Sequence, residues 1–191
     1  YLPQQFKDPA EILNQLRAFI PTGDFTLGKP VREFETRFAN LIGSKHAIGV
    51  GSGTDALKLS LKALGIGYGD EVITAANTFI ATVGAINEIG ARPIFVDCDN
   101  TFCMNVEHVA DAIGSKTRAI LPVHLTGYMT DMSKLIPLAN QMNLPVIEDA
   151  CQGILAEVGG RRAGTWGITG GFSLHPLKNL NACGDSGFIT T

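Results

Sequence analysis

The sequence lacks long apolar runs and clusters of basic residues. No stretch of about 18 apolar residues, the length that crosses a bilayer, occurs among its 191 residues, and no basic start precedes an apolar segment. The 15 Lys and Arg are scattered, with Arg161-Arg162 the densest point, and 18 Asp and Glu bring the net charge to -3. We therefore expect a cytoplasmic protein that binds small molecules rather than membranes or nucleic acids.

Metal-binding patterns are missing as well. The four cysteines form no C-x-x-C pair and the four histidines have no ligand spacing, so no metal site is expected. The chain is 45% hydrophobic and 17% charged, which indicates one compact domain with a substantial core. The cysteines are Cys98, Cys103, Cys151 and Cys183, and the histidines are His46, His108, His124 and His175.

Short apolar runs alternate with helical patterns from about residue 46, which is typical of βαβ units. The alternation predicts an α/β fold with a mostly parallel seven-stranded sheet and helices on both faces. The last two predicted strands are close in sequence, which favours one antiparallel edge. The predicted strands are 46–50, 71–74, 93–96, 118–123, 145–147, 171–174 and 187–190, and helices are expected to begin near Thr54, Thr78, Asn105 and Asp131.

Two amphipathic helices, 8–19 and 31–41, are predicted ahead of the sheet. We therefore divide the chain into an N-terminal helical segment, residues 1–45, and a large domain, residues 46–191. A domain seldom stops directly after a core strand with no closing helix behind it. The sequence is accordingly expected to be a piece of a longer polypeptide whose C-terminal domain is missing.

Two residues with complementary chemistry follow predicted strands. Asp149 comes after the apolar run 144–147, where open α/β sheets place ligands, and Lys178 lies in the loop after the strand 171–174. A carboxylate can keep a pyridine nitrogen protonated, and a lysine amine can form a Schiff base with an aldehyde. Together they indicate pyridoxal 5'-phosphate (PLP) chemistry, although an Asp also caps helices and a loop lysine is usually just solvated.

A glycine-rich segment, 51–56 (Gly-Ser-Gly-Thr-Asp-Ala), lies between a predicted strand and a predicted helix. Free amides and the positive end of the helix dipole can bind a phosphate there, although glycines also serve plain turns. The segment also fits a loose dinucleotide fingerprint, G-x-G-x-x-A, with Asp70 and Glu71 about twenty residues on. These acids lie at the start of their strand, so they would be at the wrong edge of the sheet to hold a ribose.

A set of segments in one order covers nearly the whole chain: 23–28 (Gly-Asp-Phe-Thr-Leu-Gly), 31–35 (Val-Arg-Glu-Phe-Glu), 51–57, 69–73 (Gly-Asp-Glu-Val-Ile), 78–82 (Thr-Phe-Ile-Ala-Thr), 122–127 (Pro-Val-His-Leu-Thr-Gly), 148–152 (Glu-Asp-Ala-Cys-Gln) and 173–187. In these segments the sequence resembles the DegT/DnrJ-type sugar-nucleotide aminotransferases. That family lies within the fold type I, aspartate aminotransferase-like PLP enzymes.

The resemblance implies the large domain of a PLP-dependent transferase and gives roles to particular residues. It implies that Lys178 carries the Schiff base and that Asp149 meets the ring nitrogen, which makes these two the catalytic residues. Taken singly, Phe79 would by default be core packing and Ser173 ordinary surface chemistry. The other implied cofactor contacts are Gly53, Thr54 and Ser173 on the phosphate, Phe79 stacked on the ring and Gln152 near the phenolic oxygen.

The resemblance further implies a homodimer that moves an amino group, from glutamate, to a keto group of a nucleotide-linked sugar. Some family members have histidine at the Schiff-base position and act as sugar dehydratases, whereas Lys178 favours amino transfer. The family completes its site with contacts from a partner subunit and from the region beyond Thr191. Two alternatives stay open: a PLP-dependent deoxysugar dehydratase of the same fold, and a non-catalytic module that binds a nucleotide through the glycine segment.

Overall fold

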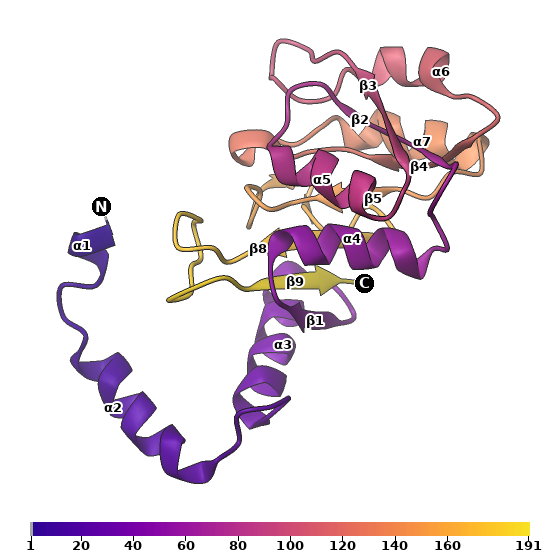
Figure 1. Cartoon of the computed structure of the whole chain (residues 1–191). Coiled ribbons are helices and arrows are strands. Elements are labelled where there is room, and N and C mark those ends of the chain that lie inside the picture. Colours follow the sequence, from indigo (N-terminus) through magenta and orange to yellow (C-terminus); the bar gives the residue numbers. More distant parts are fainter. Residues whose placement is uncertain (1) are drawn as a thin grey trace.

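One mixed sheet of seven strands lies within residues 2–191, the part of the chain that the computed structural model describes (Figure 1). Its strands form two ladders, β3-β2-β4 and β5-β8-β9-β1. Parallel bridges join β4 to β5, one of them between Val123 and Asp149. The strands are β1 (Ala47–Val50), β2 (Glu71–Ala75), β3 (Arg92–Val96), β4 (Thr117–Leu121), β5 (Ile147–Asp149), β8 (Thr169–Ser173) and β9 (Gly187–Thr190).

The sheet is parallel except at β9, which is antiparallel to both of its neighbours, β8 and β1. The predicted α/β class and mostly parallel sheet are confirmed. The antiparallel strand, however, lies one place in from the edge, and β1 takes the edge itself. The connection from Ser173 to Gly187 contains no crossover helix, so β9 returns directly beside β8. A separate small hairpin consists of β6 (Glu157–Val158) and β7 (Arg161–Arg162).

The helices begin close to the predicted positions. The predicted caps Asn105 and Asp131 are confirmed, because each side chain accepts a hydrogen bond from an amide in the following turn. Ser52 caps α4, so Thr54 lies within its first turn instead of before it. The helical elements are α1 (Leu2–Gln5), α2 (Ala10–Phe19), η1 (Ile20–Thr22), α3 (Lys29–Ile42), α4 (Gly53–Ala63), α5 (Ile80–Glu88), η2 (Val106–His108), α6 (Val109–Ala112), η3 (Leu125–Gly127) and α7 (Met132–Gln141).

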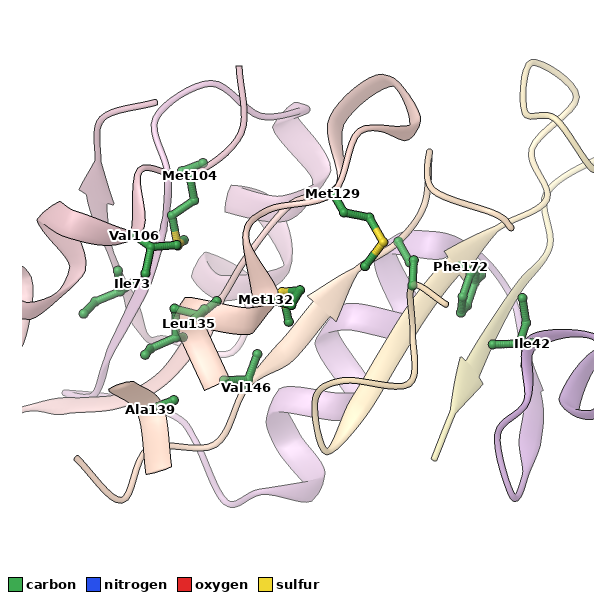
Figure 2. Close-up of a cluster of buried hydrophobic side chains, with 14 of the residues drawn as sticks. Ile42, Ile73, Met104, Val106, Met129, Met132, Leu135, Ala139, Val146 and Phe172 are labelled. Atoms are coloured by element: carbon green, nitrogen blue, oxygen red, sulfur yellow. The ribbon is translucent and has the colours of Figure 1, made fainter. Parts of the chain in front are cut away.

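Apolar side chains alternate between the two faces of the parallel strands. Ile73 and Val146 belong to a buried cluster with residues of α3, α6 and α7, including Met132 (Figure 2). Val72 and Leu121 belong to a second cluster with residues of α4 and α5. Helices therefore cover both faces of the sheet, as a parallel sheet requires.

Helix α3 packs its aromatic side chains against the antiparallel end of the sheet. Phe34 stacks on Phe188 of β9 with ring centroids 4.6 Å apart, and Phe38 meets Phe172 of β8 edge-on at 5.1 Å. By contrast, α2 contains no buried residue, and Figure 1 shows α1 and α2 lying away from the sheet. The division of the chain near residue 45 stays a prediction.

Among residues 2–191, no helix is both long enough and apolar enough to cross a bilayer. In the same part of the chain, no three His, Cys, Asp or Glu side chains are grouped so that they could hold a metal ion.

Candidate active site

A cavity of about 570 Å³ opens between the carboxyl ends of the central strands and the amino ends of α4 and α5. This is the edge at which open α/β sheets bind their ligands. The structure brings together at this cavity every site residue that the sequence predicts: Gly53, Thr54, Phe79, Asp149, Gln152, Ser173 and Lys178.

Asp149 is the last residue of β5 and is 5% exposed. The sequence predicts that this strand ends at residue 147, but parallel pairing with β8, in which Asp149 lies opposite Gly171, extends it to Asp149. Thr82 of α5 donates its hydroxyl hydrogen to Asp149 Oδ2 at 2.6 Å, and the Cys151 N–H donates to Oδ1 at 3.1 Å. Two donors suit an ionised carboxylate, which only accepts hydrogen bonds. The carboxylate is therefore held in one orientation in the cavity wall.

The Cys151 thiol also lines the cavity. Burial raises the pKa of the Cys151 thiol well above its usual value, the negative charge of Asp149 adds to this rise, and Lys178 opposes it. Since the thiolate is the reactive form of cysteine, the neutral Cys151 thiol is a packing group and a poor nucleophile.

The side-chain amide of Gln152 is fixed by the backbone. Its Oε1 accepts a hydrogen bond from the Thr126 N–H at 2.8 Å, and Thr126 adopts a left-handed backbone conformation with φ 54°. The oxygen end of the amide is thus occupied, which leaves the Nε2 hydrogens of Gln152 available to an acceptor in the cavity.

The start of α4 is suited to an anion. The first-turn amides of Gly53 and Thr54 have no partner within the helix, and the helix dipole adds positive partial charge there. Ser173 Oγ accepts the His175 N–H at 3.3 Å, so its own hydrogen remains free to donate. A Cβ on Gly53 would lie 2.7 Å from the Cβ of Ser173 and 2.8 Å from Cys151 Sγ, so only glycine fits this cradle.

Lys178 reaches the cavity from the loop after β8. Its N–H donates to the His175 carbonyl at 2.8 Å, which closes a turn, and its Nζ lies 5.6 Å from the centroid of the Phe79 ring. A cation at this distance is attracted by an aromatic face. Phe79 is 58% exposed, so its ring is open to the cavity and is not part of the core.

The dinucleotide interpretation of the glycine segment is not supported by the position of its acids. Asp70 and Glu71 lie at the amino end of β2, in ion pairs with Arg118 at 3.4 Å and Arg92 at 3.3 Å. Neither acid lines the cavity. These two acids are therefore not placed to hold a ribose hydroxyl beside the segment.

Glu148, which precedes Asp149, points to the opposite side of β5. It is completely buried, and its carboxylate accepts four hydrogen bonds that tie the loop 163–167 to the back of the site. Sequence reasoning missed this residue, together with Thr82 and Thr126, because their partners are distant in sequence. The four donors to Glu148 are His124 Nε2 at 2.9 Å, Gly164 N at 2.9 Å, Trp166 N at 2.6 Å and Gly167 N at 2.7 Å.

Comparison with known proteins places the chain in a family. Residues 7–191 match the model of the DegT/DnrJ/EryC1/StrS aminotransferase family. The chain belongs to this family. The resemblance found in the sequence is thereby confirmed.

Several curated relatives have the names of sugar transaminases. The chain is 42% identical over 192 residues to the dTDP-3-amino-3,4,6-trideoxy-alpha-D-glucose transaminase of Micromonospora megalomicea subsp. nigra, covering 100% of this chain and 51% of the relative. It is 45% identical to the UDP-N-acetyl-3-dehydro-alpha-D-glucosamine 3-aminotransferase of Acidithiobacillus ferrooxidans, covering 95% and 49%. It is 42% identical to the 3-oxo-glucose-6-phosphate:glutamate aminotransferase of Bacillus subtilis, covering 95% and 40%.

Solved structures share the fold. DesV of S. venezuelae, in complex with a ketimine intermediate, matches with a TM-score of 0.96 and 39% identity over 100% of this chain and 52% of that one. NtdA of Bacillus subtilis, with bound cofactor PMP, matches with a TM-score of 0.89 and 41% identity over 94% and 41%. The predicted transferase fold is confirmed, and the chain spans about half the length of the curated relatives it matches.

Proposed function

We propose that the whole protein is a PLP-dependent aminotransferase that moves an amino group, from glutamate, to a keto group of a nucleotide-linked sugar. The names of the dTDP-sugar and UDP-sugar transaminases support the substrate class, and glutamate in the name of the third relative supports the donor. The observation that carries the proposal is the convergence of Lys178, Asp149 and the α4 anion cradle on one cavity.

The residues at the cavity fit PLP. The cradle of Gly53, Thr54 and Ser173 offers two amides and a hydroxyl to a phosphate, and its tight packing leaves no room for a Cβ at position 53. The open face of Phe79 can stack on a ring, and the free Nε2 of Gln152 can donate to a phenolic oxygen. When bound there, PLP supplies an aldehyde that bonds to amines and a ring that withdraws electrons from the donor's α-carbon.

Two residues do the chemistry in this proposal. With PLP bound, the buried carboxylate of Asp149 would hold the proton on the ring nitrogen and so keep the ring electron-poor. Lys178 would bind the cofactor through Nζ and, once released, would carry a proton between the donor's α-carbon and the C4' carbon of the cofactor. The ring of Phe79, whose centroid lies 5.6 Å from Nζ, would border one side of this path.

The proposal includes a second subunit because the cradle has no positively charged donor of its own for a phosphate. Its donors are neutral, and Lys178 is the only Lys or Arg among the described residues that line the cavity. A phosphate carries close to two negative charges, and its strong contacts are those assisted by charge. We propose a cytoplasmic homodimer in which the partner subunit and further residues of the whole protein supply that charge.

The experiment is a product analysis with the full-length protein. A nucleotide-linked keto-sugar is incubated with PLP, with and without glutamate, and the products are identified by mass spectrometry. Amino-sugar formation that requires glutamate and disappears in Lys178→Ala supports the proposal. Loss of water from a deoxysugar without glutamate would instead identify a dehydratase, and the absence of any bound-cofactor absorbance would favour a nucleotide-binding module.

A further inference from the structure

Two threonines at the amino end of α5 form a chain of hydroxyl groups that ends on Asp149. The hydroxyl oxygens of Thr78 and Thr82 are 2.7 Å apart, and Thr82 Oγ1 lies 2.6 Å from Asp149 Oδ2. Thr82 is completely buried and Asp149 is 5% exposed. Water therefore does not compete with the bond between them, and the low local dielectric strengthens it.

The direction of this chain follows from the chemistry of its groups. An ionised carboxylate only accepts hydrogen bonds, so the single hydroxyl hydrogen of Thr82 points to Asp149. Thr82 Oγ1 is then left as an acceptor, and the Thr78 hydroxyl donates to it. Hydrogen bonds in series polarise one another, which strengthens the bond that reaches the carboxylate.

A buried threonine has simpler ways to satisfy its hydroxyl group. In a helix it can donate to the backbone carbonyl four residues earlier. Thr74 of β2 shows another ordinary outcome, because its buried hydroxyl donates to the Leu121 carbonyl at 2.8 Å. Thr82 instead donates to a side chain 67 positions away in sequence, at the cavity. This placement indicates that the Thr82 hydroxyl acts on the Asp149 carboxylate.

We propose that Thr82, backed by Thr78, is a positioning residue that fixes the plane of the Asp149 carboxylate for the ring nitrogen of PLP. This role rests on the proposed function. The Cys151 N–H binds Oδ1 and Thr82 binds Oδ2, so donors from two different elements oppose rotation of the carboxylate. The same turn carries Phe79 as the N-cap of α5, so one short segment places both the aromatic face and the anchor of the carboxylate.

Four variants of the full-length enzyme test this role. Thr82→Val removes the hydroxyl and keeps the shape of the side chain, and Thr82→Ser keeps the hydroxyl. Thr78→Val removes the outer donor from a half-buried position. Thr74→Val is the matched control, because it deletes an equally buried threonine hydroxyl that does not contact Asp149.

Each variant is titrated with PLP, and the absorbance of the bound cofactor is followed against pH, beside kcat and KM. We expect Thr82→Val to lower kcat about 10- to 100-fold, the effect of losing a hydrogen bond to a charged group, with KM for the sugar unchanged. The absorbance of its bound cofactor should titrate at a different pH from wild type. Thr78→Val should change both readouts in the same direction by less, and Thr82→Ser should restore both.

The control separates positioning from stability. Thr74→Val should lower stability without changing kcat or the absorbance titration. Equal effects in Thr74→Val and Thr82→Val, or wild-type readouts in Thr82→Val, overturn the positioning role and leave the aminotransferase function intact. If Thr82→Val does not fold, a wild-type titration in Thr78→Val overturns the role. A wild-type protein that binds no PLP overturns the proposed function, and this role with it.

Discussion

Replacing Glu148 with glutamine tests how much the buried carboxylate behind the site contributes to stability. Glu148 Oε1 accepts from the amides of Trp166 and Gly167, and Oε2 accepts from Gly164 N and His124 Nε2. Because His124 Nδ1 accepts the Thr130 N–H, Nε2 carries the ring hydrogen and acts as the donor. All four bonds therefore need acceptor oxygens.

Glutamine can satisfy only half of this set. It has one carbonyl oxygen, and its NH2 group would face two donors whichever way the amide turns. Each buried donor that loses its partner costs about 1–3 kcal/mol, so Glu148→Gln should lower the free energy of unfolding by about 2–6 kcal/mol. Since single domains are stable by about 5–15 kcal/mol, this loss is severe and leaves a marginal fold.

Urea denaturation followed by tryptophan fluorescence measures this loss. Trp166 is the only tryptophan of the chain, and its own amide binds Glu148, so the probe lies at the perturbed loop. The control is Glu33→Gln, because the Glu33 side chain is 53% exposed and its ion pair with Lys29, at 3.6 Å, lies on the surface. Surface ion pairs contribute little, so this substitution should change the free energy of unfolding by less than about 1 kcal/mol. A Glu148→Gln protein as stable as this control would refute the reasoning.

Three further predictions concern the cavity itself. Lys178→Ala should abolish the Schiff-base absorbance and amino transfer and leave the fold intact, as checked by circular dichroism, because the role proposed for this loop residue is chemical. Turnover near the wild-type rate would exclude Lys178 as the Schiff-base residue. Asp149→Asn should still bind PLP but slow turnover severely, because a neutral amide cannot hold a protonated ring nitrogen by charge; full activity would move that role elsewhere. Burial, and next the charge of Asp149, raise the pKa of the Cys151 thiol, so its alkylation by iodoacetamide should be slow at pH 7 and become faster only in strongly alkaline buffer. The exposed Cys183 should react first. Peptide mapping by mass spectrometry measures the order in which the two cysteines are alkylated.

Local features of the sequence predicted the elements well. Asn105 and Asp131 indicate where helices begin, because N-capping depends only on residues close in sequence. The apolar runs likewise indicate strands without reference to the rest of the fold. Asp149 could be placed at the cavity because parallel strands end at one edge of the sheet. The position of β9 between β8 and β1 depends on tertiary pairing, which local patterns do not contain.

The residues behind the site, Thr78, Thr82 and Glu148, could not be identified from sequence patterns for a related reason. Thr78 and Thr82 are four residues apart, which indicates a shared helix face but not what that face meets. Glu148 looks like an ordinary acid next to Asp149, and its four partners come from residues 124 and 164–167. The residues proposed to contact the cofactor lie in recognisable motifs, whereas the residues proposed to orient them are defined only by the folded packing.

The order of the strands also determines when they can pair during biosynthesis. Strand β1 leaves the ribosome early, yet the strand it pairs with, β9, is synthesised only after residue 186. Gly187 of β9 packs so closely on the start of α4 that a Cβ there would lie 2.4 Å from the Ser52 carbonyl. The start of α4 therefore stays unsupported on one side, and β1 stays an open edge, until β9 has been synthesised. A nascent chain of this kind depends on a long-range strand pairing that forms slowly, and it is exposed to aggregation until β9 is inserted.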